Sequence, residues 1–257
     1  KGAQGRLTLD DMPVRGAVQV LTVHNDDPSK PMYVADSANS ATSMATGIVT
    51  SRGRISTTAK TDHDAATIIE LAHAAGLKTG IVSTASVTDA TPAAFIAHIS
   101  KRFCENPSMM VEGLIHGLFE VECEADIKAN GGLGSIAEQI ADSQVDVVLG
   151  GGYKHFDQAA EGENKTVLQR ARDNNFYIIS NAEQLAQAPA DQKLLGLFSP
   201  STMPIKLQGE NGRIAEQPQK SLMNRIYQYF GKITLPEPMR CEANSDFVGM
   251  PTLAMMT

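Results

Sequence analysis

The chain has 257 residues, of which 42% are hydrophobic and 20% charged, and a formal net charge of −7. This composition is typical of a folded protein with a substantial core, in one large domain or two smaller ones, and it argues against disorder. The negative charge argues against a nucleic-acid partner, and no apolar run approaches the roughly 18 residues that a membrane-spanning helix needs.

Short apolar strands alternate with helical patterns along the chain. A strand is predicted over 17–23, and a helix over 65–75 that is capped by Asp62 or Asp64 and ends at Gly76. Later strands are predicted over 79–83, 145–149, 177–179 and 194–198, and later helices over 135–141, 166–174 and 182–187. This alternation predicts an α/β fold with a mostly parallel sheet, and active residues are then expected at the carboxyl ends of its strands.

Two other segments have less regular patterns. Residues 199–246 contain scattered prolines and weak periodicity, which predicts an irregular surface excursion with a possible helix over 222–230. Glycines 150–152 lack the spacing of nucleotide-binding loops and predict a tight turn between a strand and a helix.

The two ends of the sequence suggest part of a longer chain. A short helix is expected to begin after Thr252, where too few residues remain to bury an apolar face. Lys1 is not an initiator methionine and no signal peptide precedes it, so an export signal is expected to be removed or to lie outside this sequence.

Asp36 and Ser37 stand before a run of small residues that predicts a closely packed helix. The first N–H groups of a helix are unpaired and its dipole favours an anion there, which suits a serine that attacks a phosphoryl group. The alternative is a simple N-cap, since Asp and Ser are among the commonest capping residues.

Three further residues could contribute to such a site. Asp89 and Thr91 are two residues apart, so in an extended segment they point the same way and present hard oxygens that suit Mg²⁺. The alternative is that one of them caps a helix entered at Pro92. Arg102 could bind a phosphate through two donors, although a Lys-Arg pair is more often a solvated helix end.

The chain contains three cysteines: Cys104, Cys123 and Cys241. Cys104 and Cys123 could close a short disulfide loop, as in exported proteins. The alternative is three buried, unpaired thiols in a reducing compartment, and the sequence leaves both possibilities open.

Taken in order along nearly the whole chain, these segments resemble the bacterial alkaline phosphatases. The matching motifs are VADSANSAT at 34–42, LAHAAGLKTG at 71–80, VSTA at 82–85, DATPAA at 89–94, GSIAEQ at 134–139, LGGG at 149–152, LGLF at 195–198 and PTLA at 251–254. The resemblance implies that residues 1–257 are part of a single domain, a three-layer sandwich that is incomplete in this chain. Asn39 departs from the small residue that the family has there, which puts the packing behind Ser37 in doubt.

The resemblance also implies a function and a set of roles. Phosphomonoesters would be hydrolysed through a phosphoserine at Ser37, which would also ligate zinc. Asp36 would orient Arg102, Arg102 would bind the phosphate, and Asp89 and Thr91 would ligate magnesium. Two Zn²⁺ and one Mg²⁺ are implied per complete subunit, in a homodimer that is periplasmic or secreted.

The family's other metal ligands would lie ahead of Lys1 and beyond Thr257, and so would the disulfide partner of Cys241. The six histidines do not fall on zinc-ligand positions, so core or surface roles are expected; they are His24, His63, His73, His98, His116 and His155. The alternative to an active hydrolase is therefore a truncated, inactive fragment that at most binds phosphate or Mg²⁺. Ser37 lacks the Pro and Arg context of sulfatases, and phosphodiesterase relatives usually have a threonine nucleophile and lack the Arg102 equivalent.

Overall fold

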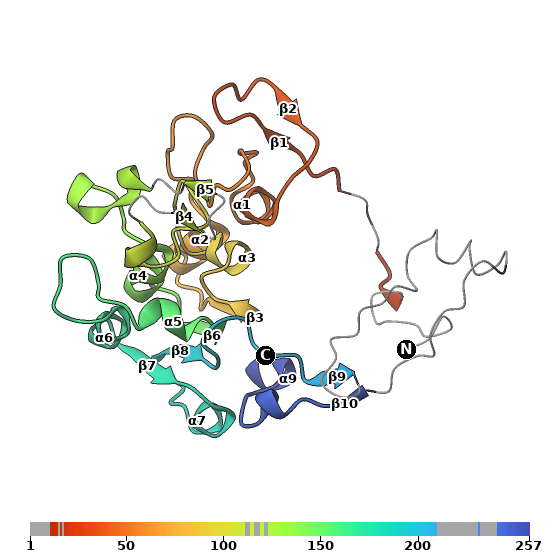
Figure 1. Ribbon diagram of the computed structural model, residues 1–257, viewed down its shortest axis with the longest axis vertical. Helices are drawn as coiled ribbons and strands as arrows, with labels where there is room; N and C mark the ends of the chain where they lie inside the picture. The colour runs from red at the N-terminus through yellow and green to blue at the C-terminus, as the bar shows by residue number, and fades with distance from the viewer. Residues whose placement is uncertain are drawn as a thin grey trace.

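A four-stranded parallel sheet organises the chain (Figure 1). Its strand order is β3-β6-β8-β7, and all three pairings are parallel. The four strands are β3 (Gly80–Ser86), β6 (Val147–Gly151), β8 (Lys193–Leu197) and β7 (Phe176–Ile179). The computed structural model describes residues 11–14, 16, 18–110, 114–115, 119–120, 123–209, 231 and 241–257.

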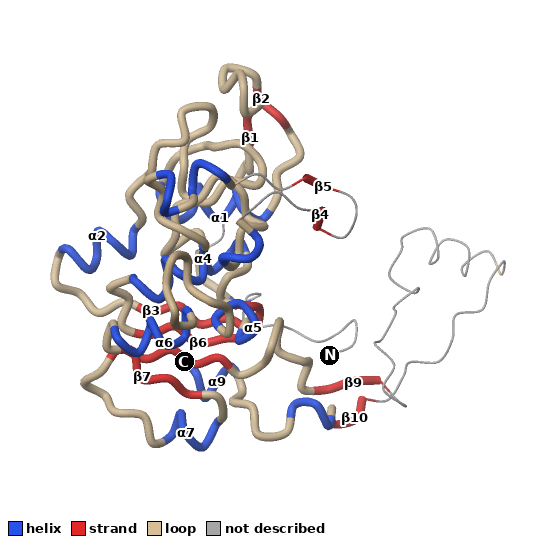
Figure 2. The backbone as a smooth tube through the Cα atoms, turned by 60° about the vertical axis from the view of Figure 1, so that its left-hand side comes forward, coloured by secondary structure: helices blue, strands red, loops and turns tan. Residues whose placement is uncertain are grey.

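Both faces of the sheet are covered, because apolar side chains alternate along its strands. Val148 and Leu195 belong to a core shared with the helices α1 (Ser37–Thr46), α3 (Ala90–Ala93), α4 (Ile136–Asp142) and α6 (Val167–Asp173). Leu149 and Leu194 point into a second core, which α7 (Ala182–Ala186) and α9 (Leu253–Met256) help to form. Figure 2 shows α4 and α7 on opposite sides of the strands. The predicted three-layer α/β architecture is confirmed.

Local side-chain signals begin most of the predicted helices. In α2 (Ile68–Ala74), α4 and α6 the N-cap hydroxyl accepts from the third helical N–H, and the side chain at that third position accepts from the N-cap N–H. The prediction that Asp62 or Asp64 caps α2 is wrong, because Thr67 occupies that position. Asp62 instead forms an ion pair with Arg54. Gly76 has φ +76° and directly follows Ala75, the C-cap of the helix, which confirms the predicted glycine stop.

The first predicted strand is much shorter than expected. Only β1 (Thr22–Val23) is a strand within the described part of 17–23, and it pairs antiparallel with β2 (Pro31–Met32). Val18 is 86% exposed and Val20 is 47% exposed, so their alternation with polar residues does not produce a buried sheet face.

The predicted turn between strand and helix is present but confined to Gly152, because Gly150 and Gly151 belong to β6, and close packing explains these glycines. A Cβ at Gly151 would lie 1.9 Å from the Ser201 carbonyl oxygen. A Cβ at Gly152, which has φ +104°, would lie 2.2 Å from Ser86 Oγ. The turn therefore brings the end of β6 against Ser86 at the end of β3 and against Ser201 in the loop after β8, before α5 (Tyr153–Phe156) begins.

The segment predicted as an excursion contains a short antiparallel ribbon. In this ribbon β9 (Leu207–Gly209) pairs with β10 (Cys241–Ala243), whereas the possible helix over 222–230 lies outside the described residues. Among the described residues, the remaining short elements are β4 (Leu114–Ile115), β5 (Phe119–Glu120) and 3₁₀ turns at Pro107–Met109, Glu124–Asp126, Lys128–Asn130 and Ser245–Phe247.

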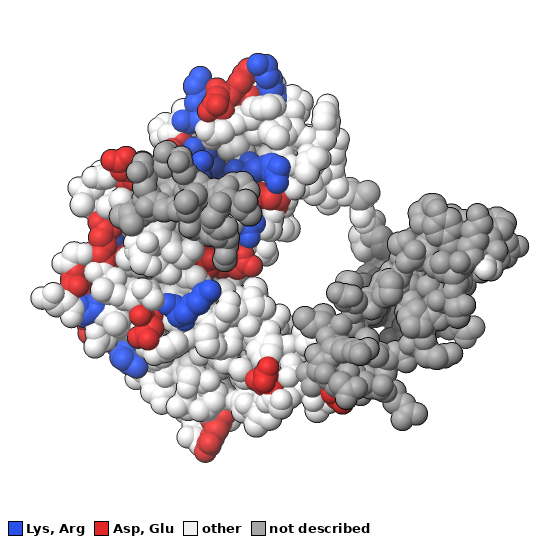
Figure 3. Space-filling view, in the orientation of Figure 1, with Lys and Arg blue, Asp and Glu red and all other residues white. Residues whose placement is uncertain are grey.

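The surface carries charges of both signs, and they lie close together on the face shown in Figure 3. Among the described residues, none of the helices combines the length and the apolar character needed to cross a membrane.

Candidate active site

Ser37 is the first residue of α1 and its side chain is exposed. Small buried residues, Ala38, Ala41 and Ala45, let this helix pack closely against its neighbours. The N-cap is Asp36, whose Oδ1 accepts from the Asn39 backbone N–H at 3.1 Å. The N-cap interpretation therefore holds for Asp36. The Ser37 hydroxyl nevertheless lies at the positive end of a ten-residue helix.

Asn39, the departure from the family pattern, has a structural role here. It is fully buried, and its Oδ1 accepts from the Asp36 backbone N–H at 2.8 Å. Its Nδ2 donates to the Leu21 carbonyl oxygen at 3.2 Å. The doubt about packing behind Ser37 is resolved, because the amide fills the space with satisfied hydrogen bonds and ties α1 to Leu21, the residue before β1.

Arg102 joins three of the predicted site residues. Its Nη1 donates to Ser37 Oγ and lies 3.6 Å from Asp36 Oδ2. Its Nη2 donates to Asp89 Oδ1 at 2.8 Å. The side chain is 21% exposed, so the guanidinium is partly shielded yet reachable from solvent. Residues separated by 65 positions in the sequence thus meet at one point.

Gly53 holds the two sides of this site together, and the sequence interpretation did not include it. Its N–H donates to Asp36 Oδ2 at 3.1 Å, and its carbonyl oxygen accepts from the Arg102 N–H at 2.7 Å. With φ +82°, the position favours glycine. The Ser-Arg-Gly-Arg sequence at 51–54 signals a turn, but nothing in it indicates which residues the turn would connect.

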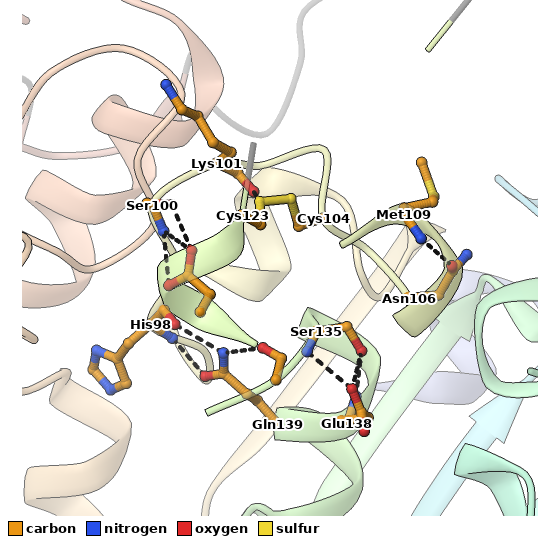
Figure 4. The surroundings of a disulfide bond; sticks show 12 residues. His98, Ser100, Lys101, Cys104, Asn106, Met109, Cys123, Ser135, Glu138 and Gln139 are labelled. Atoms are coloured by element: carbon orange, nitrogen blue, oxygen red, sulfur yellow. Dashed lines mark hydrogen bonds between the residues drawn. A yellow bond between two sulfur atoms is a disulfide. The ribbon is translucent and has the colours of Figure 1, made fainter. Parts of the chain in front are cut away.

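The segment that carries Arg102 is fixed on both sides (Figure 4). His98 exchanges two backbone hydrogen bonds of 2.8 Å with the Gln139 side-chain amide. Cys104 forms a disulfide with Cys123, with 6.5 Å between their Cα atoms. The predicted disulfide is therefore present, and it anchors the chain two residues after Arg102.

Asp89 and Thr91 lie at the start of α3 rather than in an extended segment. Asp89 is the N-cap, and its Oδ1 accepts from the Ala90 N–H at 2.8 Å. The helix begins at Ala90, two residues before Pro92, and Thr91 is exposed in its first turn. The expectation of an extended pair is wrong at Thr91, because the helix begins before it. Asp89 is thus an N-cap that also reaches the arginine.

A buried polar cluster adjoins this site and was not singled out in the sequence. Glu105 Oε2 accepts from Thr88 Oγ1 at 2.5 Å and lies 3.2 Å from His155 Nε2. Burial raises the pKa of the Glu105 carboxyl although the Thr88 hydrogen bond opposes this. Burial also lowers the pKa of His155 to about 4, so its imidazole is neutral at pH 7 and the contact is a hydrogen bond rather than an ion pair.

The described residues include no group of three or more His, Cys, Asp or Glu side chains that could hold a metal ion. Ser37, Asp89 and Thr91 contribute oxygen atoms only, which suit magnesium better than zinc. His98 and His155 are buried in hydrogen-bonded positions. The described part of the chain thus carries a partial oxygen donor set and does not form a zinc site by itself.

An exposed serine, a paired arginine and two carboxylates thus meet in an α/β fold, near the carboxyl end of the parallel strand β3, where such folds place their functional sites. Residues 2–257 match the family described as alkaline phosphatase, and the chain belongs to that family.

Curated relatives agree with this assignment. The chain is 41% identical over 211 residues to streptomycin-6-phosphate phosphatase of Streptomyces griseus, covering 81% of this chain and 44% of the relative. It is 36% identical over 258 residues to alkaline phosphatase of Escherichia coli K12, covering 97% and 49%. It is 34% identical over 265 residues to alkaline phosphatase H of Pseudomonas aeruginosa, covering 100% and 50%. The chain thus spans about half the length of these relatives.

Solved structures agree on the fold. A cold-active alkaline phosphatase from a Shewanella species matches with a TM-score of 0.53 at 26% identity, over 79% of this chain and 40% of that one. The Thermus thermophilus alkaline phosphatase matches with a TM-score of 0.51 at 22% identity, over 87% and 34%. The second likeness concerns the fold alone.

Proposed function

We propose that the protein is a phosphomonoester hydrolase in which Ser37 forms a phosphoserine intermediate. The observation that supports this most directly is the Arg102 side chain, which donates at the same time to Ser37 Oγ and to Asp89 Oδ1. Family membership and relatives named as phosphatases support the same reaction class.

Arg102 is arranged to bind the phosphoryl group. A substrate phosphate would take over the two donors that now contact Ser37 and Asp89, since a planar guanidinium pairs well with two phosphate oxygens. Asp36 keeps the guanidinium at this place through its 3.6 Å contact, and Gly53 aligns Asp36 with the Arg102 backbone. These residues together hold the phosphorus within reach of Ser37 Oγ.

Two displacements would complete the reaction. In the first, Ser37 Oγ gives up its proton and bonds to phosphorus, the bond between phosphorus and the ester oxygen breaks, and that oxygen takes up a proton and leaves as the alcohol. In the second, water attacks the phosphoserine and the bond between phosphorus and Ser37 Oγ breaks. Ser37 Oγ then takes up a proton that the water released, and inorganic phosphate leaves. The open N–H groups at the start of α1 and the Arg102 guanidinium stabilise the negative charge in both steps.

The family implies metal cofactors, for which we propose two Zn²⁺ and one Mg²⁺ per complete subunit. Ser37 would contribute to a zinc site, and Asp89 and Thr91 to the magnesium site. A bound metal lowers the pKa of a coordinated hydroxyl group and so activates it. The remaining ligands would come from outside the described residues, which by themselves hold no cluster of three candidate ligands.

We also propose a periplasmic or secreted location and a homodimeric complete enzyme. The Cys104–Cys123 disulfide supports an oxidising compartment, where such bonds persist. Substrates would be small phosphomonoesters.

A second candidate is that the 257 residues alone fold but do not catalyse hydrolysis. They would then at most bind phosphate or Mg²⁺. The absence of a candidate metal cluster among the described residues favours it, together with the half-length coverage of relatives. It differs from the first proposal in what the isolated chain does.

Replacing Ser37 with alanine tests the proposed reaction. In the complete protein, Ser37→Ala should abolish the phosphoserine seen by mass spectrometry after an acid quench. Ser43→Ala is a matched control, because that hydroxyl donates to the Asn39 carbonyl oxygen within α1. Phosphoenzyme and burst kinetics that persist in Ser37→Ala would contradict the assignment. Bound zinc near two per chain with EDTA-sensitive turnover by the 257 residues alone would contradict the second candidate.

A further inference from the structure

Arg102 lies in a turn between two supported points of the chain. This turn belongs to no helix or strand, and the bridge between Ile99 and Ile55 is the nearest sheet-like contact before it. After the arginine, the Cys104 carbonyl oxygen accepts from the Ile136 N–H of α4 at 3.1 Å. The position of the Arg102 backbone therefore depends on the individual contacts of its neighbours and not on a regular ladder of hydrogen bonds.

One contact ahead of the arginine is made by Asp126, a half-buried residue in the loop that leads to α4. The Ser100 backbone N–H donates to both carboxylate oxygens, at 3.4 Å and 3.3 Å, and Ser100 Oγ donates to Asp126 Oδ2 (Figure 4). Two donors of one residue thus converge on one carboxylate, two positions before Arg102. Burial raises the pKa of the Asp126 carboxyl, although the Ser100 hydrogen bonds oppose this, so the carboxylate is partly withdrawn from water.

Asp126 is itself held in place by its loop. Its N–H donates to the Cys123 carbonyl oxygen at 3.0 Å, and its carbonyl oxygen accepts from the Gly134 N–H at 2.7 Å. A Cβ at Gly132 would lie 2.2 Å from the Asp126 carbonyl carbon, so glycine lets the loop fold back on this residue. Ser135, which follows Gly134, caps the buried helix α4. The carboxylate is therefore fixed to the core through a short stretch of chain.

We propose that Asp126 is a positioning residue for phosphate binding, because it holds the backbone before Arg102. The guanidinium can then reach Ser37 and Asp89 together. The inference rests on the proposed function, in which Arg102 binds the phosphate. Among the described residues, Asp126 has no hydrogen bond or ion pair with Ser37 or Arg102, so its influence passes through its contact with the preceding segment. A long side chain with two partners tolerates little displacement of its Cα, because both hydrogen bonds depend on distance and angle.

The test measures the Kd of inorganic phosphate for the complete protein by titration calorimetry. Asp126→Ala should raise the Kd about tenfold, as for the loss of one hydrogen bond to a charged group. Asp126→Asn keeps an oxygen that can accept from Ser100, and its Kd should stay within about threefold of the wild-type value. The matched control is Glu124→Ala, which removes the same charge from the same turn at an exposed residue. Its Kd should stay within about twofold of the wild-type value, since solvent and salt screen an exposed charge.

A double-mutant cycle separates positioning from a general loss of structure. In the Arg102→Ala background, Asp126→Ala should raise the Kd by less than about twofold, because no guanidinium remains to be positioned. An equal rise in the two backgrounds would overturn the inference, and so would an unchanged Kd in folded Asp126→Ala.

Thermal unfolding identifies a variant that has not folded. If Asp126→Ala does not fold, Ser100→Ala decides the outcome, because it removes only the hydroxyl donor. Its Kd should rise about threefold when Arg102 is present and should not change when Arg102 is absent. An unchanged Kd in both backgrounds would overturn the inference.

Hydrolysis of phenyl phosphate by the wild-type protein, measured in parallel, tests the proposed function separately. The absence of hydrolysis would overturn the hydrolase proposal. The phosphate Kd values would still show whether Asp126 acts through Arg102, so the two failures are distinguishable.

Discussion

The central sheet and the Ser37–Arg102 site are built from different interactions. The sheet depends on apolar burial between neighbouring strands, as in Val148 and Leu195, which are fully buried. The site depends on polar contacts across long stretches of chain, such as Arg102 with Ser37 and Gly53 with Asp36. Burial is non-directional and tolerates small displacements, whereas hydrogen bonds lose strength with distance and angle. Substitutions in the sheet should therefore lower the free energy of unfolding. Substitutions in the site should weaken phosphate binding or misalign the side chains around Ser37.

The largest effect is expected in the sheet. Leu195→Ala should lower the free energy of unfolding by about 4 kcal/mol, because it removes buried methyl groups and leaves a cavity. Chemical denaturation of the 257-residue chain measures this value. Leu71→Ala is the control, since Leu71 is 59% exposed in α2 and should change stability little. Equal losses in the two variants would mean that the sheet core is not the main source of stability.

A pH effect of intermediate size is expected at His155, between the two regions. Its pKa is 6.5 when unperturbed and about 4 in the fold, so below pH 6.5 the unfolded chain binds a proton that the folded chain does not. The contribution of His155 to the free energy of unfolding is therefore at its maximum above pH 6.5. It falls by about 3 kcal/mol in total as the pH decreases towards 4. The raised pKa of Glu105 acts in the opposite sense.

Comparison with a variant isolates the contribution of His155 to the pH dependence of stability. His155→Gln should flatten the fall in unfolding free energy between pH 6.5 and 4, and His73→Gln, on the exposed side of α2, should leave it as in the wild type. An unchanged slope in His155→Gln would show that the imidazole is not held neutral.

The smallest free-energy change, about 2 kcal/mol, is expected at the site and should concern affinity. Arg102→Ala should weaken competitive inhibition by inorganic phosphate about 30-fold in the complete protein, because charge-assisted hydrogen bonds are lost. The unfolding midpoint should change little, since the Asp89 partner is 48% exposed and such pairs stabilise weakly. Arg172→Ala, at an exposed position in α6, is the control. A large loss of stability without a loss of phosphate affinity would assign Arg102 a structural role.

Features that depend on neighbouring residues were predicted well. The helices predicted over 135–141 and 166–174 and the glycine stop after α2 follow from interactions within a few residues. The cap of α2 was misplaced because several capping residues stand close together, and the Arg54 contact removes Asp62 from the choice. The strand over 17–23 was overestimated because alternation does not show whether a partner covers Val18.

The sequence by itself determined the family, the α/β alternation and the order of Asp36, Ser37, Asp89 and Arg102, because motif spacing and side-chain periodicity are local properties. Only the tertiary structure decided how these residues meet. Gly53 connects Asp36 to Arg102, Asn39 ties α1 to Leu21, and the half-buried Glu105 and the buried His155 line a neighbouring cavity. Each of these contacts joins segments that are far apart in the chain, and their geometry depends on how the whole core packs.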